Sequence, residues 1–324
     1  MDVVSLLVGA IGLGAVFLYG CVGEIITEKS GHLNLGIPGI MAAGAAGGCF
    51  FVALYVNSLP KASEASWFIV VFLGLFGSAL FGAIAGAIYA FLTVSLKCNQ
   101  NISGLALTTF GAGFSEFMRT NFIDRSNFTP AGKIVSLSLP FAKDLGWFGE
   151  IFLSHGVFVY LSIAVAIAAY FVLKKTRIGL NLRAVGESPA TADAAGIKVD
   201  AYKYGGILVG SAIAGIGGFC FIMDRSKGEW EGSATIESYG WLCIALVIFT
   251  LWKPNLAIVG SILFGALYIL PFKITATMST ASKELWKIVP YIVTVVVLLI
   301  ISIKNSKENQ PPASLGLNYF REER

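Results

Sequence analysis

Few side chains in this sequence have the types and spacing that a reaction needs. No G-x-x-x-x-G-K-[ST] pattern occurs, so the chain lacks a loop for cradling nucleotide phosphates. His32 and His155 have no partner at a metal-ligand spacing. No serine or cysteine lies in a recognisable nucleophile motif. We therefore expect no catalytic residue, and no cofactor or metal bound by this chain.

A polar solute could instead be contacted by the run GHLNLGIPG at residues 31–39. Its glycines and proline make a continuous helix unfavourable, and Gly36 and Gly39 are part of that interruption. Asn34 offers both hydrogen-bond donors and acceptors. A broken helix here would present free backbone groups to a solute, so we take Asn34, Gly36 and Gly39 as candidate pathway residues.

Glu116 is an ionisable group in the apolar run GLALTTFGAGFSEFMR. Charged groups at membrane depth are costly and are usually functional, which suggests a pathway role; Arg119, three residues later, could instead simply pair with it. Phe110 and Phe114 lie near one helical face, where a ring could stack or where core or lipid packing suffices. Tyr239 is a further candidate, although aromatic residues also populate the membrane interface.

Residues 183–198, RAVGESPATADAAGIK, form a polar insert between two long apolar segments. Ser188 is a favoured N-cap, Pro189 suits the first helical position, and Gly196 can end the helix in a left-handed conformation. The pattern predicts a helix of about two turns. Isolated helices this short are marginal in water, so tertiary contacts or a partner must hold it. We interpret the insert as a docking surface for another protein.

The composition is that of an integral membrane protein. Of the 324 residues, 56% are hydrophobic and 13% are charged, and the mean hydropathy is +0.77, whereas soluble proteins carry about 25% charged residues. A membrane-spanning helix needs about 20 mostly apolar residues. We predict an all-α bundle of about 8–10 transmembrane helices, from nine apolar stretches: Val3–Gly20, Gly36–Val56, Trp67–Leu96, Ile102–Met118, Ile151–Leu173, Lys203–Met223, Ser238–Leu251, Asn255–Phe272 and Trp286–Ile303.

Two polar segments interrupt the hydrophobic pattern, Glu24–Ile40 and Asp224–Tyr239. Paired interruptions in the two halves of a transporter point to its pathway, because unwound backbone is tolerated at membrane depth only beside a cavity. Two ordinary polar loops are the alternative. The five cysteines have no paired spacing, and we expect all of them to be small buried hydrophobic residues.

The basic residues predict the sidedness of the bundle. Lys and Arg gather around the polar insert, and short loops rich in these residues stay cytoplasmic. With nine crossings, this places the N-terminus outside and the C-terminus inside. We expect one membrane domain at 1–303, with a cytoplasmic loop at 174–202 and a cytoplasmic tail at 304–324.

Four regions resemble the permease subunits of ATP-binding-cassette (ABC) importers, in the branch for nucleosides, simple sugars and branched-chain amino acids. SGHLNLGIPGIMAAGA at 30–45 looks like the family's SGxxNxGxxGxMxxGA segment, and residues 104–119 are similar to a family membrane segment. LRAVGESPATADAAGIKV at 182–199 resembles the cytoplasmic coupling motif RAxGxxPxAAxxxGI. PPASLGLNYFREER at 311–324 is similar to the ending of one of the two paired permeases of nucleoside systems. Four matches in the correct order span nearly the whole chain.

The resemblance implies one half of a heteromeric importer in a bacterial inner membrane. A second, homologous permease would complete the pathway, and an extracytoplasmic lipoprotein would deliver substrate. Separate ATPase subunits would bind ATP and Mg and dock at the cytoplasmic loop. Residues expected to couple to the ATPase are Arg183, Glu187, Ser188, Pro189, Ala192, Ala195 and Gly196. Closure of the ATPase would move the helix as a rigid body.

The substrate stays open at this point. Nucleoside-type members commonly carry an acidic residue where this chain has Pro38. The resulting order is nucleoside first, riboflavin or a sugar next, and amino acid last. A stand-alone secondary carrier is the alternative from another class, but beyond Glu116 the spans contain almost no charged relay. An intramembrane enzyme or a structural scaffold would leave the capped helix unexplained.

Overall fold

The computed structural model describes most of the chain, and the described part is helical without strands. The described residues are 3–61, 64–123, 125–138, 142–230, 232–274, 282, 285–304 and 310–320. Part of the predicted tail, 305–309 and 321–324, lies outside them.

The helices follow one another with short connections. The first half contains α1 (Val3–Glu28), α2 (Ile37–Asn57), α3 (Trp67–Ala90) with a π-helical end η2 (Phe91–Ser95), α4 (Gln100–Phe122), α5 (Arg125–Val135), η3 (Ala142–Leu145) and α6 (Gly146–Leu153). The second half contains α7 (Val157–Lys175), α8 (Arg177–Glu187), α9 (Pro189–Ala194), α10 (Val199–Cys220) with a π-helical end η4 (Phe221–Arg225), α11 (Ser233–Phe249), α12 (Pro254–Ile274) and α14 (Val289–Lys304).

Six of the described helices are long and apolar enough to span a membrane: α1, α2, α3, α7, α10 and α12. The helices α11 and α14 are apolar but shorter, and α4 has 23 residues with a more polar sequence. Each of the nine predicted stretches therefore coincides with a described helix, which confirms the predicted all-α membrane bundle.

Small residues let the central helices approach closely. A Cβ placed on Gly44 of α2 would lie 2.2 Å from the Cα of Gly215 in α10, and one on Gly82 of α3 would lie 2.5 Å from the Ser211 carbonyl oxygen. Helices α2, α3 and α10 thus pack backbone against backbone, and α1 packs against α10 and α12. Without a hydrophobic drive between helices in lipid, such close van der Waals packing stabilises the bundle.

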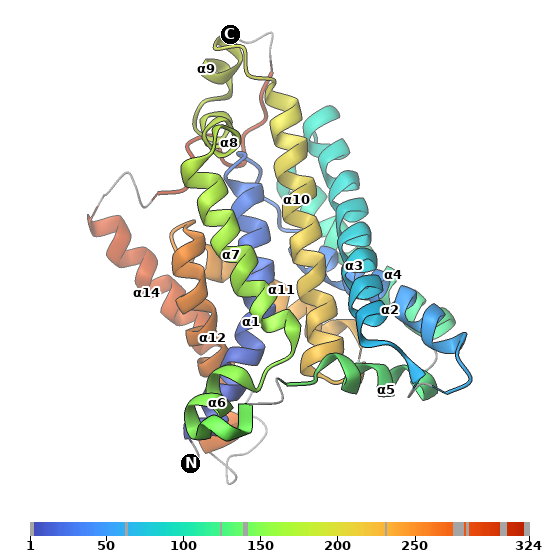
Figure 1. Cartoon of the computed structure of the whole chain (residues 1–324). Helices are drawn as coiled ribbons and strands as arrows, with labels where there is room; N and C mark the ends of the chain where they lie inside the picture. Colours follow the sequence, from blue (N-terminus) through green and yellow to red (C-terminus); the bar gives the residue numbers. More distant parts are fainter. Residues whose placement is uncertain are drawn as a thin grey trace.

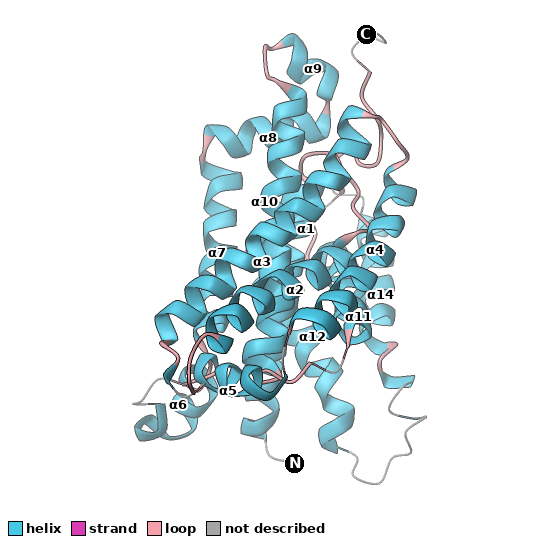
Figure 2. Cartoon of the chain, turned by 90° about the vertical axis from the view of Figure 1, so that its right-hand side faces the viewer, coloured by secondary structure: helices cyan, strands magenta, loops and turns pink. Residues whose placement is uncertain are grey.

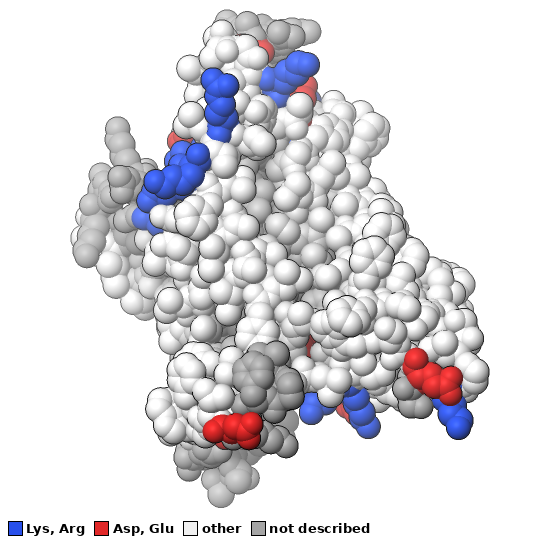
Figure 3. All heavy atoms as spheres, viewed as in Figure 1, with Lys and Arg blue, Asp and Glu red and all other residues white. Residues whose placement is uncertain are grey.

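The bundle has two distinct ends (Figure 1). The N-terminus, α5 and α6 lie at one end, and α8, α9 and the C-terminus lie at the other. Figure 2 shows α8 and α9 above the bundle, with α8 running across its axis. On the face drawn in Figure 3, Lys, Arg, Asp and Glu gather at the two ends and leave an uncharged band between them. This arrangement matches a multi-pass protein, with the α8–α9 end as the predicted cytoplasmic side.

The two predicted interruptions are narrower than expected and lie at bundle ends. Helix α1 continues through Glu24 and Glu28, so the first interruption is only the loop 29–36. The two carboxylates are tolerated because the Glu24 side chain accepts the Asn34 N–H and the Glu28 side chain accepts the Trp252 indole N–H. The second interruption is the loop 226–232. Of the two interpretations, polar loops fit the described residues better than unwound helix at mid-membrane.

Four of the five cysteines are buried, as predicted. Cys98 is the exception and is half-buried, because it lies in the short turn between η2 and α4 rather than inside a helix.

Candidate functional site

The predicted short helix of the polar insert is α9, at Pro189–Ala194. The Ser188 hydroxyl oxygen accepts the Thr191 N–H at 3.3 Å, and Pro189 occupies the first helical position. Gly196 follows the helix with φ +81°, a left-handed conformation that glycine adopts without strain. The capping signals in the sequence are therefore confirmed.

One side of α9 faces the protein and the other faces solvent. Ala192 is 3% exposed and packs with Val185 of α8 and Val199 of α10. Glu187, Ala195 and Gly196 are exposed, whereas Arg183, Ser188 and Pro189 are half-buried. The exposed side of α9 is small and uncharged: Ala190, Thr191, Ala194 and Ala195. Of the seven expected coupling residues, Ala192 thus anchors the helix inward instead of lining its free side.

The C-terminal tail, residues 310–320, holds this region from above. The Ser314 N–H donates to the Gly186 carbonyl at 3.0 Å, and the Ala313 N–H donates to the Glu187 carboxylate at 3.3 Å. The Tyr319 hydroxyl donates to the Asp193 carboxylate of α9 at 2.9 Å. The tail is therefore docked on both α8 and α9.

The same tail also contacts the membrane bundle. The Gly316 N–H donates to the Gly31 carbonyl in the α1–α2 loop at 3.2 Å. The Asn318 amide donates to the Lys97 carbonyl at 2.7 Å, and the Gln100 amide at the start of α4 donates to the Leu317 carbonyl at 3.4 Å. These contacts join α9 to the starts of α2 and α4. Sequence analysis assigned the tail to the cytoplasmic side, but gave no sign that it docks.

The loop 29–36 uses its polar groups for its own structure. Asn34 is fully buried, and its carbonyl oxygen accepts the Gly36 N–H at 2.9 Å. The Tyr89 hydroxyl donates to the Leu33 carbonyl at 2.6 Å. Burial lowers the pKa of His32 to about 3, so this side chain is neutral at physiological pH.

Gly36 and Gly39 let α2 pack on α4. A Cβ on Gly39 would lie 2.3 Å from the Leu107 carbonyl oxygen, and one on Gly36 would lie 3.0 Å from a Leu107 side-chain carbon. Their part in the structure is thus close helix packing, beneath α4 and away from its exposed side.

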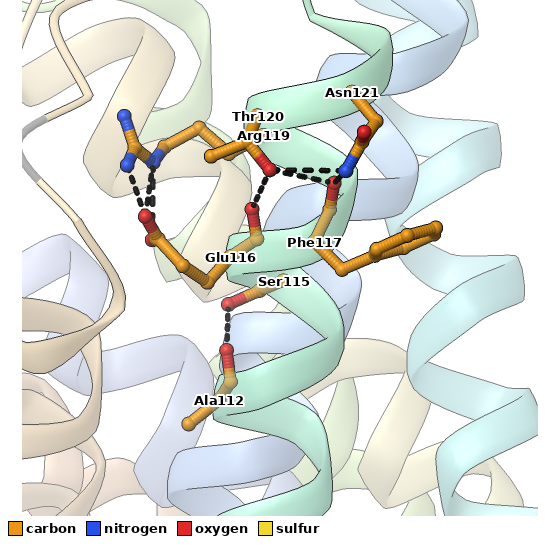
Figure 4. Close-up of polar contacts among 7 residues, drawn as sticks. All are labelled: Ala112, Ser115, Glu116, Phe117, Arg119, Thr120 and Asn121. Carbon is orange, nitrogen blue, oxygen red and sulfur yellow. Dashed lines mark hydrogen bonds and ion pairs between the residues drawn. The ribbon is translucent and has the colours of Figure 1, made fainter.

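The exposed side of α4, which we call the α4 face, carries hydroxyls and an ion pair. The Glu116 carboxylate accepts Arg119 N–H groups and is 40% exposed (Figure 4). Thr109, Gly113 and Thr120 are exposed on the same side of the helix. A Cβ on Gly113 would meet nothing within 4 Å.

The depth of the α4 face matters for its environment. Phe114 stacks on Phe81 in the middle of α3, with ring centroids 5.9 Å apart, so Glu116 lies near the centre of the bundle. Other exposed helix surfaces carry large apolar groups, such as Ile292 and Leu299 of α14. Hydroxyls and an ion pair are costly in lipid, so the α4 face requires contact with protein or water. Phe110, 55% exposed, stacks on Phe114 at 6.1 Å along its edge.

Tyr239 lies apart from the α4 face. It is 7% exposed and packs edge-on against the rings of Phe17, Phe221 and Tyr268, at 5.4, 5.0 and 5.3 Å. The seven predicted pathway residues thus divide between the α1–α2 connection with the start of α2, the α4 face and this aromatic cluster. No described group of three or more His, Cys, Asp or Glu side chains could hold a metal ion.

Comparison with known proteins agrees with this architecture. Nucleoside ABC transporter permease protein NupC of Lactococcus lactis is 30% identical over 94% of this chain and 93% of its own length. Putative glucose ABC transporter permease protein TsgC13 of Haloferax volcanii is 32% identical, over 81% of this chain and 75% of its own. Guanosine ABC transporter permease protein NupQ of Bacillus subtilis is 27% identical, over 92% and 93%. No solved structure matches.

A family assignment follows from the length of the match. Residues 6–298 match the family described as the permease component of the branched-chain amino acid transport system. The matched region covers the nine helices that coincide with predicted spans, together with α8 and α9. These relatives are transporter permeases and not enzymes. The chain belongs to this family of ABC transporter permeases.

Proposed function

We propose that this chain forms half of the pathway of an ABC importer for nucleosides, in a bacterial cytoplasmic membrane. The residues 1–303 would be the membrane domain and 304–324 the cytoplasmic tail. ATP and Mg would be bound by separate ATPase subunits, and an extracytoplasmic lipoprotein would deliver the substrate.

The observation that carries this proposal is the capped helix α9, held above the bundle by α8, α10 and the tail. Its exposed side is small and uncharged, which suits insertion into a cleft on an ATPase. The tail joins α9 to Gly31 before α2 and to Gln100 at the start of α4. A displacement of α9 would therefore reach α4 as a rigid-body shift.

The α4 face supports a second permease subunit. Its ion pair and its exposed threonines need a polar environment at membrane depth, which a water-filled path between two subunits provides. Phe110 and Phe114, beside this face, are placed to stack on a planar ring. Asn34, Gly36, Gly39 and Tyr239 would support the pathway from behind.

Nucleosides come first as substrates because two of the relatives are named as nucleoside and guanosine permeases and match over more than nine-tenths of this chain. A simple sugar is the second candidate, because the relative from Haloferax is named as a putative glucose permease and is 32% identical. Riboflavin follows from the sequence resemblance alone.

The test is uptake of labelled guanosine by cells with and without this chain, with unlabelled nucleosides, riboflavin, ribose and leucine as separate competitors. We expect uptake to be lost without the chain, and to be competed by nucleosides only. Competition by ribose alone would reassign the substrate to a sugar. Unchanged guanosine uptake in the deleted strain, with loss of none of the other substrates, would contradict the proposal.

A further inference from the structure

A groove lies between α7, α8 and α10, next to the helices that carry α9. It has a volume of about 610 Å³, within the roughly 300–1,000 Å³ of small-molecule sites. Its lining is almost entirely apolar and includes Val172, Ile178, Gly205, Val209, Ile213 and, from α1, Ile26. Val172, Ile178 and Val209 are 44%, 65% and 52% exposed, so the groove opens on the side of the bundle that would face lipid.

Two cations stand at one end of this groove. Lys175 and Arg177 are exposed in the α7–α8 turn, between the lining residues Leu173 and Ile178. The turn is fixed, because the Thr176 hydroxyl oxygen accepts the Gly179 N–H at 3.1 Å and caps α8. Among the described residues, no carboxylate forms an ion pair with either cation. Their charges are thus available to a ligand.

The groove and the cations together match the two parts of a phospholipid. An acyl chain is apolar and reaches the groove from within the membrane, while a water-soluble ligand would have to cross the headgroup layer. Basic pockets between transmembrane helices on the cytoplasmic side bind anionic headgroups. We propose that this groove binds one anionic phospholipid of the cytoplasmic leaflet, with its acyl chain along α10 and its headgroup at Lys175 and Arg177.

The site is joined to the coupling helix. The Asn181 amide of α8 donates to the Tyr202 hydroxyl of α10 at 2.7 Å, beside the groove, and Tyr202 also lines it. Helix α8 ends at Ser188, which begins α9. A bound lipid would thus hold α8 against α10 and fix the height of α9. This consequence for coupling rests on the proposed function, whereas lipid binding does not.

Lipid binding is measured directly, by native mass spectrometry of the full chain with equal amounts of phosphatidylglycerol and phosphatidylcholine. Gly205→Leu fills the groove, because a Cβ at Gly205 meets nothing within 4 Å. Val209→Trp fills it from a second position. The pair Lys175→Gln/Arg177→Gln removes the charges. Its matched control is Arg225→Gln/Lys227→Gln, two exposed cations with the same spacing at the opposite end.

We expect the wild-type chain to retain phosphatidylglycerol preferentially. Each juxtamembrane cation contributes about fivefold to binding of an anionic lipid, so the Lys175/Arg177 double variant should lose roughly 25-fold in preference. The control pair should keep it, and both filling variants should lose the bound lipid at an unchanged melting temperature. Equal retention of both lipids by the wild-type chain would overturn the proposal, as would unchanged phosphatidylglycerol binding in the two filling variants.

Discussion

Ser188 links two helices of the coupling region. Its N–H donates to the Ala184 carbonyl at 2.9 Å at the end of α8, and its hydroxyl caps α9. Backbone and side chain of one residue thus set the angle between the two helices. Such a position is sensitive to side-chain chemistry even though it is half-buried and contacts no substrate.

Replacing Ser188 tests this role. Ser188→Ala should destabilise α9 by about 1 kcal/mol, because the Thr191 N–H loses its acceptor. Hydrogen exchange at 189–196 should accelerate and ATP-driven uptake should fall, with the melting temperature of the bundle unchanged. Ser188→Asp keeps an acceptor and should preserve both readouts. If alanine and aspartate behave alike, the cap does not position α9.

At the scale of the elements, the tail connects α9 with the bundle through several hydrogen bonds. Ending the chain after Gln310 should release α9, so that ATPase activity of the assembled complex persists while uptake falls. Tyr319→Phe should show a smaller effect of about 1 kcal/mol, because it removes the single hydrogen bond to Asp193. Phe320→Ala, an exposed neighbour, is the control. Full uptake by the truncated chain would show that the tail does not transmit motion.

The α4 face makes a separate prediction. Cysteines introduced at Thr109, Gly113 and Thr120 in a Cys98→Ser background should react with a membrane-impermeant thiol reagent in the assembled transporter. A cysteine at Leu299, on the apolar side of α14, should not react. The four native cysteines that remain are buried. If the α4 positions are as unreactive as Leu299, lipid covers this face and it lines no path.

The sequence predicts those elements whose signals are local. Helix α9 is read from Ser188, Pro189 and Gly196, which lie within nine residues, and the apolar helices follow from composition. The extent of α1 was not predictable, because Glu28 is accommodated by Trp252, which lies 224 residues away. The tail contacts are equally remote in sequence. Asn34 was singled out correctly as a special residue, but only the fold shows that its carbonyl oxygen closes a turn.

For the whole molecule, two ends and a central bundle divide the work. The α8–α9 end presents a helix for a partner, the bundle holds it through α1 and α10, and the α4 face supplies polar groups at membrane depth. These parts lie in a chain whose family match extends over residues 6–298. The central claim is that motion enters through α9 from a separate ATPase.

Co-purification of the ATPase subunit with the Gly196→Pro chain tests that claim most directly. Proline cannot adopt the φ of +81° found at Gly196, so the end of α9 must rearrange. Gly146→Pro is the matched control, a glycine with φ +60° and open surroundings at the opposite end of the bundle. We predict that the Gly196 variant inserts normally but loses the ATPase, whereas the Gly146 variant retains it. Equal recovery of the ATPase with both variants would contradict the account.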